Sequence, residues 1–128
     1  MAGLNVAKYD VICNVDDDNH LNPYYLSKLF QIYNNNPSID MCGGMGIAIT
    51  NKSDGLPSYF KDFSDCYAVG APAAQTGFLN RKTDFLYGAG FSYKKNKLQV
   101  IIKAGFKFQL IGREGRNLLS GEDMEMYL

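Results

Sequence analysis

Short apolar runs alternate along this chain with segments whose apolar positions recur at helical spacing. Residues 11–15 form the first run, a β-branched stretch between Asp10 and an acidic segment, which predicts a buried strand. Asn22 followed by Pro23 is typical of a helix start, and the polar stretch 34–37 is expected to end that helix. Its predicted buried stripe has the spacing i, i+3, i+4, i+7 and consists of Leu26, Leu29, Phe30 and Tyr33.

The next apolar run, residues 39–49, predicts a second strand that contains three glycines, Gly43, Gly44 and Gly46. Glycine within a strand is typical of a bulge or of a close approach between two backbones. Periodicity is then lost across residues 50–83, which are rich in loop-forming and aromatic residues. A long segment without a clear period in a small domain is commonly a binding loop or part of an interface, and the sequence leaves both open.

Regular patterning resumes in the last third of the chain. Residues 84–93 predict a strand interrupted by glycines, and residues 94–104 have the apolar spacing of a helix that Gly105 would cap. Alternating apolar and polar positions in residues 106–111 predict a half-buried strand, and residues 120–123 have the pattern of a last helix start. Strands that alternate with helices indicate an α/β fold.

The composition is that of one ordinary globular domain. The 128 residues are 46% hydrophobic and 20% charged, and 13 basic residues balance 13 acidic ones. This neutrality gives no electrostatic reason to expect a nucleic acid as partner. Because three cysteines are an odd number and no apolar stretch reaches 18 residues, we expect free thiols and a cytoplasmic location, with membrane association left open for a full-length protein.

Three consecutive carboxylates, Asp16, Asp17 and Asp18, directly follow the first predicted strand. In an extended chain Asp16 and Asp18 would point the same way about 7 Å apart. At that distance two like charges repel by roughly 2 kcal/mol if the effective dielectric constant is about 20. A shared divalent cation would relieve this repulsion, and Mg²⁺ or Mn²⁺ prefers such oxygen ligands. The alternative is a solvated acidic loop between a strand and a helix, and the spacing alone does not decide between them.

Other site chemistries can be tested against the same segment. A calcium-binding EF-hand loop would need Gly and Glu where this chain has Leu21 and Ser27, so that site is excluded. A single histidine, His20, without further ligands at the usual spacing gives no zinc site, and no glycine-rich Walker loop is present. A haloacid-dehalogenase-type phosphohydrolase, with Asp16 as nucleophile, resembles the segment better, although that family's pattern has Thr or Val at the place of His20.

Three segments taken together resemble family 2 nucleotide-sugar glycosyltransferases. Residues 9–23, YDVICNVDDDNHLNP, resemble the family's apolar strand, Asp-x-Asp motif and proline-started helix. Residues 85–95, FLYGAGFSYKK, resemble its glycine-rich strand with two basic residues, and residues 118–123, LLSGED, resemble its Glu-Asp motif at a helix start. The three segments occur in the family's order over most of the chain.

The resemblance implies the fold and the activity of that family. The fold would be part of a GT-A type, Rossmann-like α/β domain, with a mixed sheet flanked by helices. The activity would be the transfer of a sugar, with inversion, from a nucleotide-sugar donor to a hydroxyl of a saccharide or lipid-linked acceptor, as in bacterial polysaccharide biosynthesis. Asp18 would bind Mn²⁺ or Mg²⁺, Asp123 would be the general base, and the donor would be held by Asp16, Asp17, Gly88 and Arg113.

The same residues also have simpler explanations. Ser120 with an acidic residue three positions later is close to a helix capping box, which does not exclude catalysis by Asp123. A non-catalytic module whose acidic loop caps a helix is therefore a third hypothesis. Because the family's N-terminal nucleotide-binding strands have no counterpart in this sequence, we expect the chain alone to be a poor catalyst, and we expect open sheet edges through which copies self-associate.

Overall fold

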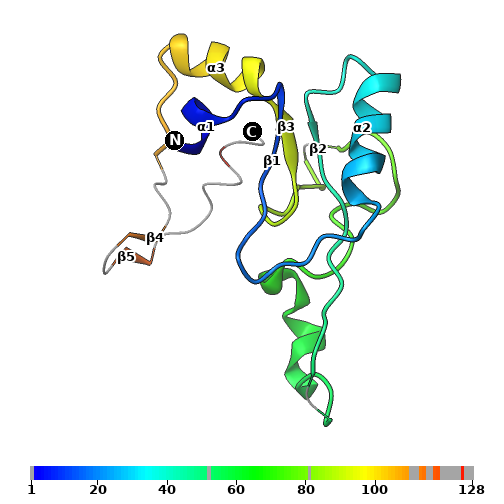
Figure 1. The fold of residues 1–128 in the computed structure, drawn as a ribbon. Coiled ribbons are helices and arrows are strands. Elements are labelled where there is room, and N and C mark those ends of the chain that lie inside the picture. Colours follow the sequence, from blue (N-terminus) through cyan, green and yellow to red (C-terminus); the bar gives the residue numbers. More distant parts are fainter. Residues whose placement is uncertain are drawn as a thin grey trace.

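A three-stranded sheet lies at the centre of this computed structural model, which describes residues 2–51, 53–80, 82–109, 113–114, 117–118 and 125 (Figure 1). The strands, in the spatial order β1-β3-β2, are β1 (Val11–Cys13), β3 (Ser92–Lys94) and β2 (Met41–Cys42). Tyr93 in the middle strand is opposite Ile12 on one side and Met41 on the other, and both pairings are antiparallel. The predicted α/β class is thus confirmed as a small mixed α/β domain, but these strands pair antiparallel and not as the mixed sheet that we expected.

The remaining elements are short. The helical segments are α1 (Ala2–Val6), α2 (Tyr25–Asn35), η1 (Ser58–Asp62), η2 (Ser64–Tyr67) and α3 (Lys95–Lys103), of which η1 and η2 are 3₁₀ helices. A two-stranded antiparallel hairpin consists of β4 (Arg113–Glu114) and β5 (Asn117–Leu118). The hydrophobic pattern predicts α2 and α3, which are confirmed, but not α1. Within the described part of the chain, no helix has the length and apolar character needed to cross a bilayer.

The two faces of β3 are covered by different helices (Figure 1). Successive side chains of a strand point to opposite faces of the sheet. Ser92 is fully buried, and its hydroxyl lies 3.0 Å from that of Tyr33 in α2. Tyr93 belongs instead to a cluster with Leu4 of α1 and Leu98 of α3. The chain therefore forms three layers, with α2 on one side of the sheet and α1 with α3 on the other.

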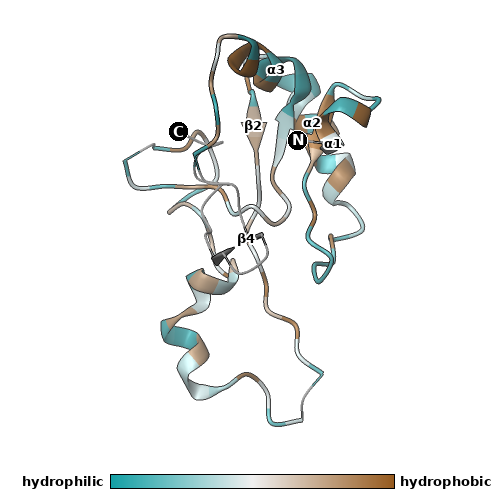
Figure 2. Cartoon of the chain, turned by 90° about the vertical axis from the view of Figure 1, so that its left-hand side faces the viewer, coloured by the Kyte–Doolittle hydropathy of each residue, from teal (hydrophilic) through white to brown (hydrophobic). Residues whose placement is uncertain are grey.

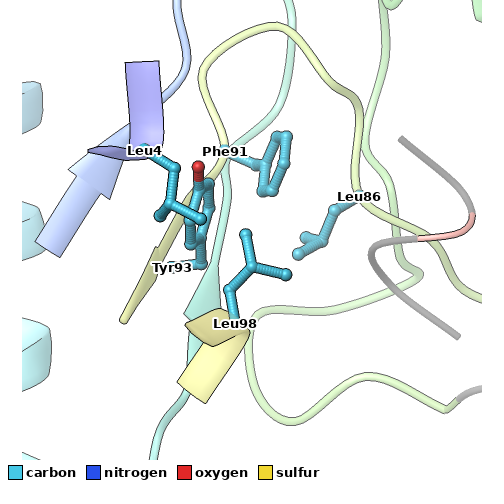
Figure 3. Packing of buried hydrophobic residues seen from close by; sticks show 5 residues of the cluster. All are labelled: Leu4, Leu86, Phe91, Tyr93 and Leu98. Atoms are coloured by element: carbon cyan, nitrogen blue, oxygen red, sulfur yellow. The ribbon is translucent and has the colours of Figure 1, made fainter. Parts of the chain in front are cut away.

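The apolar core lies on the α1 and α3 side of the sheet (Figure 3). It joins α1, β3, α3 and the loop that precedes β3, and its buried members are Leu4, Leu86, Phe91, Tyr93 and Leu98. Phe91 and Tyr93 lie two positions apart and therefore on one face, with ring centroids separated by 5.6 Å. Burying one such large apolar side chain contributes about 1.5–3 kcal/mol. This cluster is accordingly the main support of a sheet whose strands are only two or three residues long.

The predicted helix boundaries depend on local interactions that the structure contains. The Asn22 side-chain oxygen accepts a hydrogen bond from the Tyr24 N–H (2.9 Å) in the turn that leads into α2. At the other end of the fold, Gly105 has φ of 96° and follows Ala104, the C-cap residue of α3. The N–H groups of Gly105 and Phe106 return to carbonyls of the last turn of α3, which is a Schellman motif. The predicted capping role of Gly105 is confirmed.

Several predictions of local structure are wrong in part. Leu26 and Phe30 are exposed, because the narrow sheet covers only the side of α2 that carries Leu29. Of the predicted strand 84–93, only the last two residues belong to β3, since the chain turns through its glycines before pairing. Residues 106–109 form no strand, and their two phenylalanine rings pack edge to face against each other with centroids 5.1 Å apart. β1 is half-buried and not buried as predicted.

Candidate functional site

The acidic residues that were predicted to bind a metal lie in a turn and not in a strand. β1 ends at Cys13, and the Asp16 carbonyl accepts a hydrogen bond from the Asn19 N–H (3.1 Å), which closes a four-residue turn. The extended backbone that would place Asp16 and Asp18 on one face is therefore not formed. Asp18 accepts a hydrogen bond from the side-chain amide of Asn19 (2.9 Å), and all three aspartates are exposed.

A cavity of about 220 Å³ opens beside this turn. Its wall comes from three separate segments and consists of Asp16, Asp65, Cys66, Ala68 and residues 85–89. Asp16 and Gly88 thus lie in one wall, although they belong to two different segments of the glycosyltransferase resemblance. Asp17 and Asp18 are not among the residues that line the cavity.

A close contact between two backbones positions the wall that contains Ala68. Gly46 and Gly70 exchange two backbone hydrogen bonds, of 3.1 and 3.0 Å. A β-carbon on Gly46 would lie 1.8 Å from the Ala68 carbonyl oxygen, so no other residue is compatible with this approach. The prediction of a close backbone approach in the glycine-containing run is confirmed at this position. Ala68 itself has φ of 54°, which is uncommon for a residue other than glycine.

Tyr87 and Asp65 form a polar contact in the wall of the cavity. The Tyr87 hydroxyl donates to Oδ1 of Asp65 at 3.3 Å. Burial, followed by the negative charge of Asp65 and this hydrogen bond, raises the pKa of Tyr87 above its ordinary value. The phenol therefore remains a donor at neutral pH. Asp16 and Asp65 place two carboxylates around one cavity, and carboxylate oxygens are the ligands that Mg²⁺ and Mn²⁺ bind.

Polar contacts with α2 hold the glycine loop, residues 88–90, which contributes to the wall of the cavity. The Tyr25 hydroxyl donates to the Gly90 carbonyl. In β3, the Ser92 hydroxyl donates a hydrogen bond to the Cys42 carbonyl (3.0 Å) and accepts one from the Tyr33 hydroxyl. Burial is the main cause that raises the pKa of Tyr25 and of Tyr33 to about 12, so both phenols stay protonated and keep these contacts.

The two lysines of the second motif segment have structural contacts away from the cavity. The Lys94 ammonium donates to the Pro37 carbonyl and lies 3.4 Å from the Asp40 carboxylate. The Lys95 ammonium donates to the Ala7 carbonyl at 2.6 Å. Neither lysine lines the cavity. Lys94 thus connects the start of α3 to the segment after α2, and Lys95 connects it to the segment after α1.

Two of the predicted site residues fall where the structure gives no side-chain position. Asp123 lies outside the described residues, as does the side chain of Arg113, whose backbone belongs to β4. Among the residues that are described, no three Asp, Glu, His or Cys side chains gather into a group that could hold a metal ion. Asp65 and Tyr87 are cavity residues that the sequence did not single out. Tyr87 lies inside the glycine-rich motif segment, whereas Asp65 lies in the stretch without a clear period.

Comparison with known proteins adds no relative. The chain matches no protein-family model, no curated protein and no solved structure. The resemblance to family 2 glycosyltransferases therefore rests on the three sequence segments.

Proposed function

We propose that the chain is the metal- and acceptor-binding part of an inverting glycosyltransferase of the family 2, GT-A type. The reaction would transfer a sugar from a nucleotide-sugar donor to a hydroxyl of a saccharide or lipid-linked acceptor. The observation that carries this proposal is the common cavity of Asp16 and Gly88. The two residues come from separate motif segments, and the antiparallel pairing of β1 with β3 brings the end of one segment beside the start of the other.

The residues around the cavity suit a diphosphate that carries a divalent cation. Bound Mn²⁺ or Mg²⁺ would stabilise the negative charge that develops on the departing nucleoside diphosphate, more in the transition state than in the ground state. Asp16 and Asp65 offer carboxylate oxygens to such an ion. Tyr87 holds the Asp65 carboxylate through its hydroxyl and so orients it. At Gly88 the absence of a side chain lets a ligand approach the backbone closely.

Two further residues keep the roles that the family resemblance gives them. Asp18 remains a proposed metal ligand, in the same turn as Asp16. Asp123 remains the proposed general base, because an acceptor hydroxyl is a poor nucleophile and a positioned carboxylate accelerates such a step by about 10²–10⁴-fold. Both assignments rest on sequence alone.

Two other functions make different demands on the same cavity. A haloacid-dehalogenase-type phosphohydrolase with Asp16 as nucleophile would need a lysine beside the phosphate. No Lys or Arg is among the described residues that line the cavity, so this alternative has no support from the lining. A non-catalytic module would use the acidic turn only to lead into α2, and would bind neither a metal ion nor a nucleotide.

Isothermal titration of the full chain with nucleoside diphosphates, with and without Mn²⁺, tests the proposal. We expect binding that requires the metal. Asp16→Asn should weaken it by about 10–100-fold, the effect of losing one charge-assisted contact of about 1.5–3 kcal/mol. Asp62→Asn is the matched control, because Asp62 is an exposed aspartate of η1 that does not line the cavity, and its affinity should equal that of the unmodified chain.

The outcomes separate the three functions. Nucleotide binding that is unaffected by Mn²⁺ would overturn the proposal. The absence of both metal and nucleotide binding would overturn it and favour a non-catalytic module. Stable capture of a phosphate analogue on Asp16 would favour the phosphohydrolase.

A further inference from the structure

Two tyrosine hydroxyls connect α2 to the segment that contains β3. The helix buries Leu29 and carries hydrophilic as well as hydrophobic residues along its length (Figure 2). The Tyr33 hydroxyl is bonded to that of Ser92, which belongs to β3 itself. The Tyr25 hydroxyl donates instead to the carbonyl of Gly90, the last residue of the glycine loop beside the cavity. The two contacts are of the same kind, but of the two it is that of Tyr25 that reaches the loop.

The glycine loop is held at its last residue. The Gly90 N–H donates to the Asn14 carbonyl at 2.8 Å, and the Gly90 carbonyl accepts from Tyr25. The Cys13 thiol, 3.9 Å from the same carbonyl, is a second and weaker donor. Within the described part of the chain, no hydrogen bond reaches residues 88–89, which line the cavity. The position of this part of the wall therefore depends on Gly90.

The contacts of Gly90 also join the two motif segments that share the cavity. Asn14 accepts from Gly90 and donates its own N–H to the Phe91 carbonyl at 2.9 Å. Asn14 lies two residues before Asp16, which lines the cavity. Gly90 lies two residues after Gly88, which lines it from the other segment. A shift of Gly90 therefore moves the part of the wall that contains Gly88 relative to the part that contains Asp16.

The ring of Tyr25 lies against the backbone that follows β2. A β-carbon on Gly44 would lie 3.1 Å from Cε2 of the ring, closer than the 3.4 Å at which ordinary contact begins, so glycine at this position makes room for the ring. Because such close packing restricts the movement of the ring, its hydroxyl is presented to the Gly90 carbonyl in a fixed position. Tyr25 is thus in contact with two separate segments, at Gly44 and at Gly90.

We propose that Tyr25 is a positioning residue for the cavity, which acts through Gly90 to fix the wall that contains Gly88 relative to the wall that contains Asp16. Tyr25 is not among the residues that line the cavity, so it does not contact the ligand itself. The effect on ligand binding rests on the proposed function, in which a metal-bound diphosphate contacts both walls. Groups that orient the residues around a metal ion typically alter its affinity about 10–100-fold when they are replaced.

Tyr25→Phe tests the proposal, because it removes the hydroxyl and keeps the ring. In the titration of the full chain with Mn²⁺ and a nucleoside diphosphate, we expect this variant to bind about 10-fold more weakly or worse. Tyr33→Phe is the matched control, because it removes a hydroxyl of the same helix that bonds to Ser92 and not to the glycine loop. The control should bind as tightly as the unmodified chain, and circular dichroism verifies that each variant is folded.

Amide NMR of the chain without ligand reports on the glycine loop directly. In Tyr25→Phe the Gly90 amide should exchange its hydrogen faster, and the amide signals of residues 88–89 should shift, whereas Tyr33→Phe should leave both unchanged. A role limited to general stability would change the two variants alike. Gly44→Ala is a second variant, which retains the hydroxyl but displaces the ring, and it should shift the same loop signals.

Weaker binding and altered loop signals in Tyr25→Phe, with neither change in Tyr33→Phe, would support the proposal. An affinity of Tyr25→Phe equal to that of the unmodified chain would overturn it. So would equal changes in the two tyrosine variants, and so would loop signals that neither Tyr25→Phe nor Gly44→Ala moves. If the unmodified chain binds no nucleotide, the proposed function fails, and the exchange of the Gly90 amide together with the loop signals still decides whether Tyr25 positions the wall.

Discussion

Replacing Gly46 by alanine tests the backbone contact that forms one wall of the cavity. The new β-carbon would lie 1.8 Å from the Ala68 carbonyl oxygen and 2.9 Å from its carbonyl carbon, whereas ordinary contact begins at 3.4 Å. Both of these atoms belong to the backbone, so no side-chain rotation can relieve the overlap. The two segments must separate by about 1.5 Å to restore an ordinary contact, which pulls apart the hydrogen-bonded backbones of Gly46 and Gly70.

The free energy of unfolding that is lost through this separation can be estimated in two ways, which are not added because both describe the same relaxation. It breaks the two hydrogen bonds between Gly46 and Gly70, each with a net contribution of about 0.5–1.5 kcal/mol. Overpacking by one added carbon typically costs about 1–3 kcal/mol. We therefore expect the free energy of unfolding to fall by about 2–3 kcal/mol, a large part of the ~5–15 kcal/mol of an ordinary domain.

Urea unfolding followed by circular dichroism measures this loss. Gly3→Ala in α1 is the matched control, because a β-carbon there meets nothing within 4 Å. Alanine in a helix is favoured over glycine by about 0.5–1 kcal/mol, so the control should be at least as stable as the unmodified chain. In Gly46→Ala, the Gly70 amide, which bonds to the Gly46 carbonyl at 3.0 Å, should also exchange its hydrogen faster. Equal urea midpoints for the two variants would refute the close contact and the cavity wall built on it.

Two further predictions concern the buried tyrosines and the three cysteines. Because burial raises the pKa of Tyr25 and Tyr33 from 10.0 to about 12, the stability that they contribute is complete below pH about 10 and is lost as the pH rises toward 12. A tyrosinate absorbance titration should show a group of tyrosines that ionise late, and Tyr33→Phe should remove one of them. Simultaneous ionisation of all tyrosines would contradict this. Cys66 is exposed, whereas burial raises the pKa of Cys13 and of Cys42. A thiol reagent should therefore modify Cys66 first in the folded chain. Equal modification rates for the three thiols would be inconsistent with the structure.

Features that depend on neighbouring residues were determined by the sequence. Asn22 accepts a hydrogen bond two residues along the chain, and Gly105 adopts a positive φ immediately after the helix that it ends. Both interactions form within one turn of backbone, so they need no knowledge of the rest of the fold. The glycines of residues 39–49 likewise predicted a close backbone approach, although not which segment would approach.

Features that depend on distant residues were decided by the tertiary structure. The sequence placed Asp16 and Asp18 on one face by assuming an extended backbone. In the structure β1 ends at Cys13, Asn14 makes the last backbone hydrogen bonds to residues 90 and 91, and a turn follows. Strand length is set by the partner strand, and regular pairing on this partner begins at Ser92, after the glycines of residues 88–90. Side-chain periodicity describes one segment at a time and carries no information about where its partner ends.

The residues that line the cavity also fall into two groups, those that the sequence singled out and those that only the fold brings there. Its motif residues, Asp16 and Gly88, could be named from the sequence because each lies in a recognisable segment. Asp65 and its contact with Tyr87 could not, because no local pattern marks Asp65 and its position depends on the hydrogen bonds between Gly46 and Gly70. Local backbone preferences act over a few residues, whereas a cavity is defined by which separate segments pack together, and only the folded chain settles that.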